Sequence, residues 1–246
     1  MLPLSDPSLR TGKRPYVNVA IIVVNAVVFL YEITLGDMAT FFYTYGLIPQ
    51  ELTSGHTFTT LLTQGGRLDI TTPFPTWATL FTSMFIHGSW MHFIGNMVYL
   101  WVFGDNIEGR IGHIPYLLFY VVAGVVAAFT QVAIAPASQV PTVGASGAIA
   151  GVLGAYLVLY PRSRVNTLFF AIFITVIQIP AALLLGVWIL MQFVSGLGSL
   201  GVSSQSGGVA YWAHIGGFAL GAAVFWVYRM LPRKRPPPYP FPGEWE

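Results

Sequence analysis

Two residues that could act as a nucleophile and its base occur in apolar surroundings. Ser146 lies in the segment GASGA, and His214 lies in the segment AHIGG. A serine hydroxyl is a weak nucleophile until a base within hydrogen-bond reach takes its proton, and histidine is the usual base near neutral pH. Both residues fall near the start of an apolar stretch. They are therefore expected at similar depth if these stretches are helices that enter a membrane from the same side.

Further polar residues lie in the segment HGSWMHFIGN. His92 and Asn96 are four residues apart, a spacing that places both side chains on one face of a helix. His87, in the same segment, is interpreted as a hydrogen-bonded structural histidine. A zinc protease would require a His-Glu-x-x-His helix, and His87 and His92 have the wrong spacing and no Glu between them. We therefore expect no metal site and no cofactor.

The composition indicates that a membrane must position these groups. Hydrophobic residues make up 55% of the 246 residues, charged residues make up 8%, and the mean hydropathy is +0.68. A soluble domain carries roughly 25% charged residues, so the chain is expected to be an integral membrane protein in contact with the lipid bilayer. The chain has no Cys, which excludes disulfides and thiolate chemistry. Its net charge of +2 without a basic patch argues against a nucleic-acid partner.

The apolar runs predict the fold class. A membrane span needs about 20 apolar residues, and only helices or closed barrels satisfy their backbone in lipid. The runs lack the alternation of barrel strands, which predicts an all-α membrane protein, a bundle of six transmembrane helices in one domain over residues 1–246. The six expected helices lie at about 17–34, 77–103, 113–134, 144–160, 167–194 and 209–231.

The basic residues predict the orientation of this bundle. Lys and Arg concentrate in cytoplasmic loops, and all of them except Arg67 fall on one side of the six expected spans. Both termini are therefore predicted to be cytoplasmic, with a Pro-rich, disordered tail at 232–246. The Gly- and Ser-rich segment 195–208 is predicted to be a flexible outer loop, which could be a lid or a slack linker.

Small residues indicate that the fourth and sixth spans approach closely. Gly147, Gly151 and Ala155 recur every four residues, as do Gly217 and Gly221. Such ridges let helix backbones meet, and packing alone would explain them. Each ridge, however, begins beside the candidate nucleophile or the candidate base. The pattern therefore predicts that the two side chains meet.

The fourth span is short for a membrane. Its 17 expected residues would extend roughly 25 Å at 1.5 Å per residue, less than the ~30 Å hydrocarbon core. Ser146 is then expected below the outer surface. The preceding segment APASQVPTV, 135–143, would be irregular backbone at membrane depth, which is tolerated where it lines a water-filled cavity.

The combination of motifs and their order resembles one family. GASGA, AHIGG, HGSWMHFIGN and the EGR that follows are similar to motifs of the rhomboid intramembrane serine proteases, and the resemblance covers about 77–231 strongly. It implies that Ser146 is the nucleophile and His214 the general base, in a dyad. No Asp or Glu occurs from 113 to 231 to serve as a third member. His92, Asn96 and the backbone N–H of Ser146 are implied to stabilise the oxyanion.

The resemblance also assigns supporting residues. Gly144 would keep the turn before the serine free of a side chain, and Glu108 and Arg110 match a structural Glu-x-Arg pair. Ala150 is a departure, because several members place an aromatic residue there that stacks on the catalytic histidine. His214 is therefore expected to be held differently in this chain.

The implied activity is hydrolysis of a peptide bond in or near the transmembrane helix of a membrane-protein substrate. A soluble-hydrolase elbow is excluded, because position 148 is Ala where Gly-x-Ser-x-Gly needs Gly. A transporter would show midplane charges and an inverted repeat. The alternative that remains is a non-catalytic rhomboid-like protein that binds or escorts membrane segments. The chain is expected to be a multi-pass protein of a prokaryotic plasma membrane. Its sequence does not indicate an oligomeric state.

Overall fold

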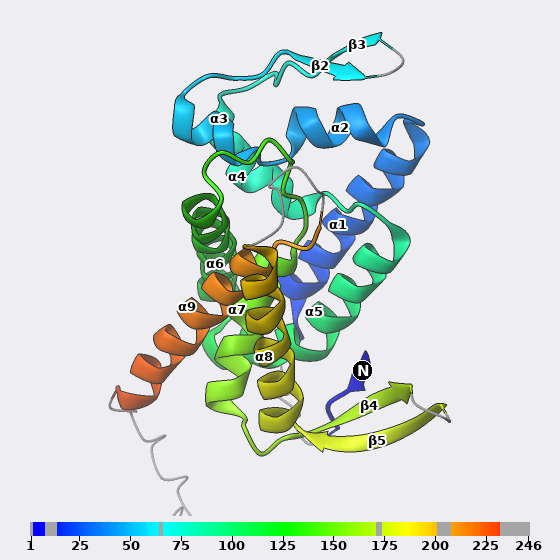
Figure 1. Cartoon of the computed structure of the whole chain (residues 1–246). Coiled ribbons are helices and arrows are strands. Elements are labelled where there is room, and N and C mark those ends of the chain that lie inside the picture. The colour runs from blue at the N-terminus through cyan, green and yellow to red at the C-terminus, as the bar shows by residue number, and fades with distance from the viewer. Residues whose placement is uncertain (1, 8–13, 64–65, 171–173, 201–207, 232–246) are drawn as a thin grey trace, which may run out of the picture.

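The computed structural model describes most of the chain (Figure 1). The described residues are 2–7, 14–63, 66–170, 174–200 and 208–231. The predicted tail at 232–246 lies outside the described residues, as do residues 201–207 of the predicted loop at 195–208. The first part of that predicted loop, up to Ser199, is helical, so the loop prediction is wrong there.

Long helices form the body of the molecule. They are α1 (Tyr16–Thr34), α5 (Trp90–Ile111), α6 (His113–Ile134), α7 (Ser146–Leu159), α8 (Ala181–Ser199) and α9 (Tyr211–Met230). The shortest, α7, lies at the centre in contact with α5, α6, α8 and α9. Every residue from Gly147 to Tyr156 in α7 is buried. The helix that begins with Ser146 is thus enclosed by its neighbours.

Three of these helices are long and apolar enough to cross a membrane, namely α1, α6 and α8. The central helix α7 is also apolar but has only 14 residues. The chain is therefore a mostly helical membrane protein. Each long helix overlaps one of the six predicted spans, while the count of six spans and the cytoplasmic termini remain predictions.

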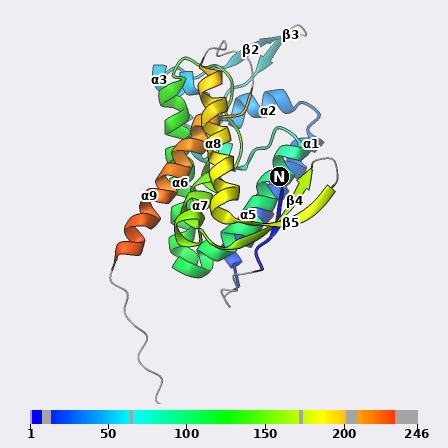
Figure 2. The same cartoon turned by 60° about the horizontal axis from the view of Figure 1, so that its bottom comes forward.

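The prediction of an all-α fold is wrong in part, because the described residues include two small antiparallel sheets. One sheet has the strand order β1-β4-β5, with β1 at Leu2–Ser5, β4 at Arg164–Phe170 and β5 at Ile174–Pro180. The other pairs β2 (Thr60–Thr63) with β3 (Gly66–Asp69). The two sheets lie at opposite ends of the helical bundle (Figure 1). A turned view shows the N-terminal strand beside β4 (Figure 2).

The predicted helix at 167–194 is wrong in its first half. The β4–β5 hairpin occupies that half, with Arg164 opposite Pro180 and Phe170 opposite Ile174. The prediction used apolar content alone, which a helix and a strand can share. The sequences RVNTLFF and ITVIQIP are rich in β-branched and aromatic residues, which favour strands. Pro180 also disfavours helical backbone at the residue before it. As a result α8 begins at Ala181 and continues to Ser199.

The predicted helix at 77–103 is also wrong in its first part. Short turns of helix cover its start: η1 (Thr76–Ala78), α4 (Thr79–Thr82) and η2 (Ser83–Phe85). The chain then breaks before α5, which runs eight residues beyond the expected end, to Ile111. Ser89 caps α5 in extended conformation, and its hydroxyl accepts a hydrogen bond from the backbone N–H of His92. The break leaves His92 and Asn96 in the first two turns of α5.

Between α1 and the short turns lie two more helices, α2 (Met38–Tyr45) and α3 (Pro49–Ser54). Together with β2 and β3 they cover one end of the bundle in Figure 1. Leu47, between α2 and α3, exchanges backbone hydrogen bonds with Thr142 in the segment that leads to α7. This loop region therefore supports the approach to Ser146.

The Glu-x-Arg pair links helices at the other end. The Glu108 carboxylate accepts hydrogen bonds from the backbone N–H groups of Val17 at 2.9 Å and Asn18 at 2.7 Å. These are first-turn donors of α1, which have no partner within their own helix. The Arg110 guanidinium lies 5.9 Å from the ring centroid of Tyr228 on α9. Both contacts are structural, which agrees with the anchoring role that the resemblance implies.

Candidate active site

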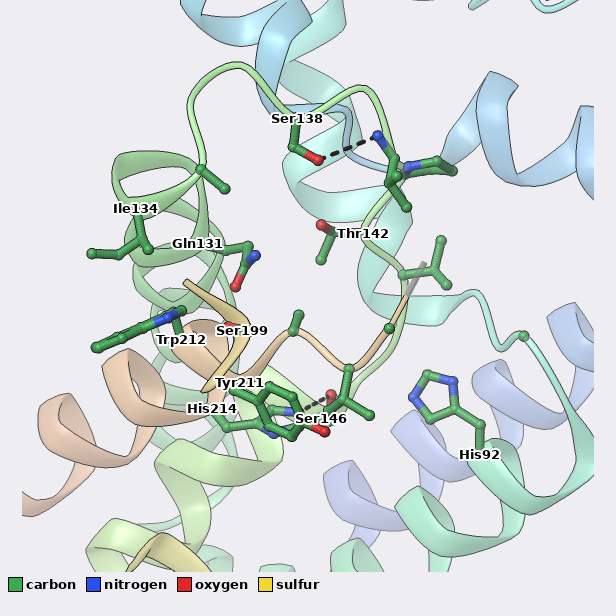
Figure 3. Close-up of a pocket in the computed structure, with 18 of the residues that line it drawn as sticks. His92, Gln131, Ile134, Ser138, Thr142, Ser146, Ser199, Tyr211, Trp212 and His214 are labelled. Atoms are coloured by element: carbon green, nitrogen blue, oxygen red, sulfur yellow. Dashed lines mark hydrogen bonds between the residues drawn. The ribbon is translucent and has the colours of Figure 1, made fainter. Parts of the chain in front are cut away.

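Ser146 and His214 meet in the structure. The hydroxyl oxygen of Ser146, the first residue of α7, lies 2.7 Å from His214 Nε2 in the first turn of α9 (Figure 3). His214 is buried, with only 7% of its surface exposed. This distance is that of a hydrogen bond, so the imidazole is placed to take the hydroxyl proton.

Glycines allow the two helices to approach so closely. A Cβ atom at Gly217 would collide with the carbonyl oxygen of Gly147, and one at Gly221 would collide with that of Gly151. The small-residue ridges predicted from the sequence thus face one another across the interface of α7 and α9. Backbone contact, and not only side-chain packing, fixes how Ser146 lies relative to His214.

The other nitrogen of the imidazole contacts a residue that the sequence analysis missed. His214 Nδ1 lies 2.8 Å from Oε1 of Gln192 on α8. A neutral imidazole carries one N–H, so donation from Nδ1 to the amide oxygen leaves Nε2 as the acceptor that faces Ser146. A signal was available, since Gln192 is a polar residue within an apolar helix.

The aromatic contact that several family members make from the position of Ala150 is made here from α8. Ala150 is fully buried, and the Trp188 ring lies with its centroid 5.7 Å from that of His214, at an interplanar angle of 36°. Trp188 is four residues before Gln192, which places both on one face of α8. The ring that packs on His214 therefore comes from a different helix. This agrees with the expectation that His214 is held differently where Ala150 replaces an aromatic residue.

The candidate oxyanion donors lie on α5 across the cavity. The Nδ2 atom of Asn96 is buried and has no hydrogen-bond partner in the described structure. Asn96 and His92 both line the same cavity as Ser146. Figure 3 shows His92 on one side of Ser146, with Gln131 and Trp212 on the other. An unpaired amide N–H₂ beside a candidate nucleophile is suited to bind a developing negative charge.

Gly144 shapes the approach to the serine. Its φ of +127° belongs to the region that favours glycine. A Cβ atom at this position would lie 2.7 Å from His92 Nε2 and 3.5 Å from the Ser146 hydroxyl oxygen. The backbone N–H of Gly144 donates to the carbonyl of Ser83 at 2.8 Å. The glycine thus keeps the space between His92 and Ser146 open.

The candidate residues line a cavity of about 1060 Å³. The irregular segment 135–143 contributes to its wall, together with α5, α6, α7, α8 and α9 (Figure 3). Polar atoms of Gln131 and Trp212 on this wall are buried without a hydrogen-bond partner in the described structure. Such atoms indicate a site for water or for a polar ligand such as a peptide backbone.

His87 does not join the pair. His87 is fully buried, and its backbone N–H donates to the Glu32 carboxylate. Its ring lies 5.1 Å from that of His92, centroid to centroid, and both ring nitrogens lack a partner in the described structure. The interpretation of His87 as a hydrogen-bonded structural histidine is therefore supported by its backbone N–H, and a hydrogen bond of the ring stays a prediction. The described residues also contain no group of three or more His, Asp or Glu side chains that could hold a metal ion.

These observations define a helical membrane protein with an apposed serine and histidine in a cavity between helices. Comparison with known proteins agrees with this class. The profile of a family described as "Rhomboid domain" matches residues 75–231. The chain therefore belongs to the rhomboid family.

Relatives in several organisms are similar to part of the chain. Rhomboid protein 1, mitochondrial, of Saccharomyces cerevisiae is 28% identical over 148 residues, which are 58% of this chain and 40% of that protein. Rhomboid-like protein 11, chloroplastic, of Arabidopsis thaliana is 36% identical over 78 residues, which are 32% of this chain and 28% of that protein. The human Presenilin-associated rhomboid-like protein, mitochondrial, is 34% identical over 93 residues, which are 37% of this chain and 24% of that protein.

The chain thus spans less than half the length of these relatives. Their names place them in mitochondria or chloroplasts. The chain is an integral, multi-pass membrane protein, and the expected prokaryotic plasma membrane gains no support from these relatives.

Proposed function

We propose that the chain is an intramembrane serine protease, which hydrolyses a peptide bond in or near the transmembrane helix of a membrane-protein substrate. The observation that carries this proposal is the 2.7 Å hydrogen bond between Ser146 and His214 in a cavity between apolar helices. Membership of the rhomboid family supports it. An intact and hydrogen-bonded pair favours catalysis over the alternative of a non-catalytic binding protein.

The first step is attack by Ser146. Its hydroxyl oxygen forms a bond to the scissile carbonyl carbon, while Nε2 of His214 takes the hydroxyl proton. The carbonyl oxygen becomes an oxyanion. His214 then gives its proton to the amide nitrogen, the C–N bond breaks, and the amine product leaves an acyl-enzyme on Ser146.

The oxyanion is bound by donors already present around the cavity. We assign this role to His92, to the Nδ2 group of Asn96 and to the backbone N–H of Ser146. First-turn N–H groups of a helix have no partner within that helix, so the start of α7 offers a donor and a favourable dipole. Donors that are fixed before the reaction need no reorganisation as charge develops.

Water completes the reaction. His214 takes a proton from a water molecule in the cavity, the resulting hydroxide attacks the acyl carbon, and Ser146 regains its proton as the ester bond breaks. The irregular segment 135–143 supports this step, because non-helical backbone in a membrane requires a polar or water-lined surface. No cofactor is required for any of these bonds to form or break.

Substrates of this site must expose a backbone carbonyl. A transmembrane helix hides its carbonyls in hydrogen bonds, so cleavage requires local unwinding. We therefore propose that preferred substrates have Gly, Pro or other weak helix formers near the scissile bond.

The test is cleavage in reconstituted vesicles of a single-span substrate whose helix contains a Gly-Pro interruption. The wild-type chain should cleave it, whereas Ser146→Ala and His214→Ala should not. Ser199→Ala is a matched control, since Ser199 lines the same cavity but donates to the Gly196 carbonyl. Equal cleavage by wild type and Ser146→Ala would contradict the proposal.

The arrangement in the membrane belongs to the same proposal: one domain of six spans with both termini on the cytoplasmic side. The absence of Cys makes a direct test simple, because single cysteines can be introduced and labelled with an impermeant maleimide. Arg67→Cys should be labelled from the outer side, and Arg162→Cys only after the vesicle is opened. The reverse pattern would contradict the orientation.

A further inference from the structure

We propose that Gln192 is a positioning residue that holds His214 in the tautomer with a proton on Nδ1 and a free lone pair on Nε2. This inference rests on the proposed function, since it assigns how the base of that reaction is prepared. The geometry that carries it is a chain of two contacts. Gln192 Oε1 lies 2.8 Å from His214 Nδ1, and His214 Nε2 lies 2.7 Å from the Ser146 hydroxyl oxygen.

Only one tautomer of a neutral imidazole suits both contacts. If Nδ1 carries the proton, it donates to the amide oxygen of Gln192, and Nε2 accepts from the Ser146 hydroxyl. If Nε2 carries the proton, His214 has no lone pair for the serine. In that case the lone pair of Nδ1 also faces the lone pairs of Oε1. The amide oxygen therefore selects the tautomer in which His214 can act as a base.

Gln192 takes the orienting position that a carboxylate holds in a Ser-His-Asp triad. The segment from 113 to 231 offers no Asp or Glu for that position. A neutral amide supplies the same acceptor without the free-energy cost of placing a charge among apolar helices. The pair of catalytic residues thus has a third, uncharged member that sequence motifs do not reveal.

The location of Gln192 indicates that it acts through His214 and not on a substrate. The cavity is lined by Trp188 and His214 but not by Gln192. Its side chain is half-buried behind the imidazole, while neighbours on α8 such as Met191 and Phe193 are exposed. A polar group in an apolar helix needs a partner, and the partner of this amide oxygen is the catalytic histidine.

Two variants separate the role of the acceptor from the role of packing. Gln192→Leu keeps a similar volume but removes the acceptor, and kcat should fall about tenfold to a hundredfold with KM unchanged. This is less than the full contribution of general-base catalysis, about 10²- to 10⁴-fold, because His214 itself remains. Gln192→Glu retains an oxygen that accepts from Nδ1 whether or not the carboxyl is ionised, so kcat should recover to within about threefold of wild type. Met191→Leu, an exposed neighbour, serves as the matched control and should be unchanged.

The tautomer can be measured without any turnover. The full chain is labelled with ¹⁵N-histidine, and the His214 signals are assigned by their loss in His214→Gln. The Ser146→Ala background prevents reaction. We expect a protonated Nδ1 and an unprotonated Nε2 with Gln192 present, retention of this pattern in Gln192→Glu, and its loss in Gln192→Leu.

The outcomes distinguish this inference from the proposed function. An unchanged tautomer in Gln192→Leu would overturn the role of Gln192. A folded Gln192→Glu as slow as Gln192→Leu would overturn it as well. If the tautomer responds as expected but the wild-type chain cleaves no substrate, the positioning role stands and the proposed protease activity fails.

Discussion

The central helices α7 and α9 differ from the flanking helices α5 and α8 in how they build the site. The central pair carries Ser146 and His214, and glycines bring its backbones into direct contact. The flanking helices contribute only side chains: His92 and Asn96 from α5, and Trp188 and Gln192 from α8. Substitution of the interface glycines of the central pair should therefore disturb folding, whereas loss of the flanking side chains that contact the site should alter the rate of a folded protein.

The largest expected effect tests the α5 flank. Asn96→Ala removes a buried N–H₂ group that has no partner in the described structure, so the folded state loses no hydrogen bond from this group. Loss of one oxyanion donor should lower kcat about 10²- to 10³-fold. Steady-state cleavage and thermal unfolding of the same sample check this prediction. An unchanged rate would show that Asn96 does not bind the oxyanion. A large loss of stability would contradict the expectation that side chains of the flanking helices affect rate and not folding.

The next effect tests the centre. Gly221→Ala places a Cβ atom against the Gly151 carbonyl oxygen, which is rigid backbone. Overpacking of this kind should reduce the free energy of unfolding by about 1–3 kcal/mol. Denaturant unfolding in detergent micelles measures it. Normal stability in this variant would mean that the α7–α9 interface yields more easily than its glycines indicate.

A smaller effect tests the α8 flank. Trp188→Leu removes the ring that packs on His214, and aromatic contacts contribute about 0.5–1.5 kcal/mol beyond buried area. We expect kcat to fall about twofold to tenfold, with Trp188→Phe closer to wild type. Cleavage assays on both variants check this order. Equal rates for Trp188→Leu and wild type would show that Gln192 alone is sufficient to hold the ring.

The smallest effect sharpens the comparison with a matched glycine. Gly186 lies within α8, and no atom lies within 4 Å of a Cβ atom placed there. Gly186→Ala should therefore stabilise the protein by about 0.5–1 kcal/mol through helix propensity, opposite in sign to Gly221→Ala. The two unfolding curves are measured side by side. Destabilisation of both variants by a similar amount would show that burial at the α7–α9 interface is not the cause.

The same division explains what the sequence predicted. Ser146, His214 and the glycine ridges lie within short local motifs, and a helical period is enough to place them on facing surfaces. Trp188 and Gln192 contact His214 only through the tertiary packing of α8. Residues this far apart in the chain give no local signal of their contact, although Gln192 could be noticed as a polar residue in an apolar helix.

The secondary-structure errors arise because hydropathy distinguishes neither a helix from an apolar strand nor one long helix from two segments joined by a break. The β-branched residues of β4 and β5, followed by Pro180, carried the missing information. At the start of α5, the sequence Gly88-Ser89 marks a break and a cap that a continuous apolar run concealed. The membrane class was predictable from overall composition, whereas the strands β4 and β5 are indicated only by the local content of β-branched and aromatic residues.

Labelling with a fluorophosphonate probe tests most directly whether His214 activates Ser146. The serine oxygen would form a bond to phosphorus as fluoride leaves, and mass spectrometry would locate the adduct. We predict an adduct on Ser146 in the wild-type chain and in the Ser199→Ala control, and none in His214→Ala. Equal labelling of Ser146 with and without His214, or no adduct on a folded wild-type chain that also cleaves no substrate, would contradict activation of the serine by this histidine.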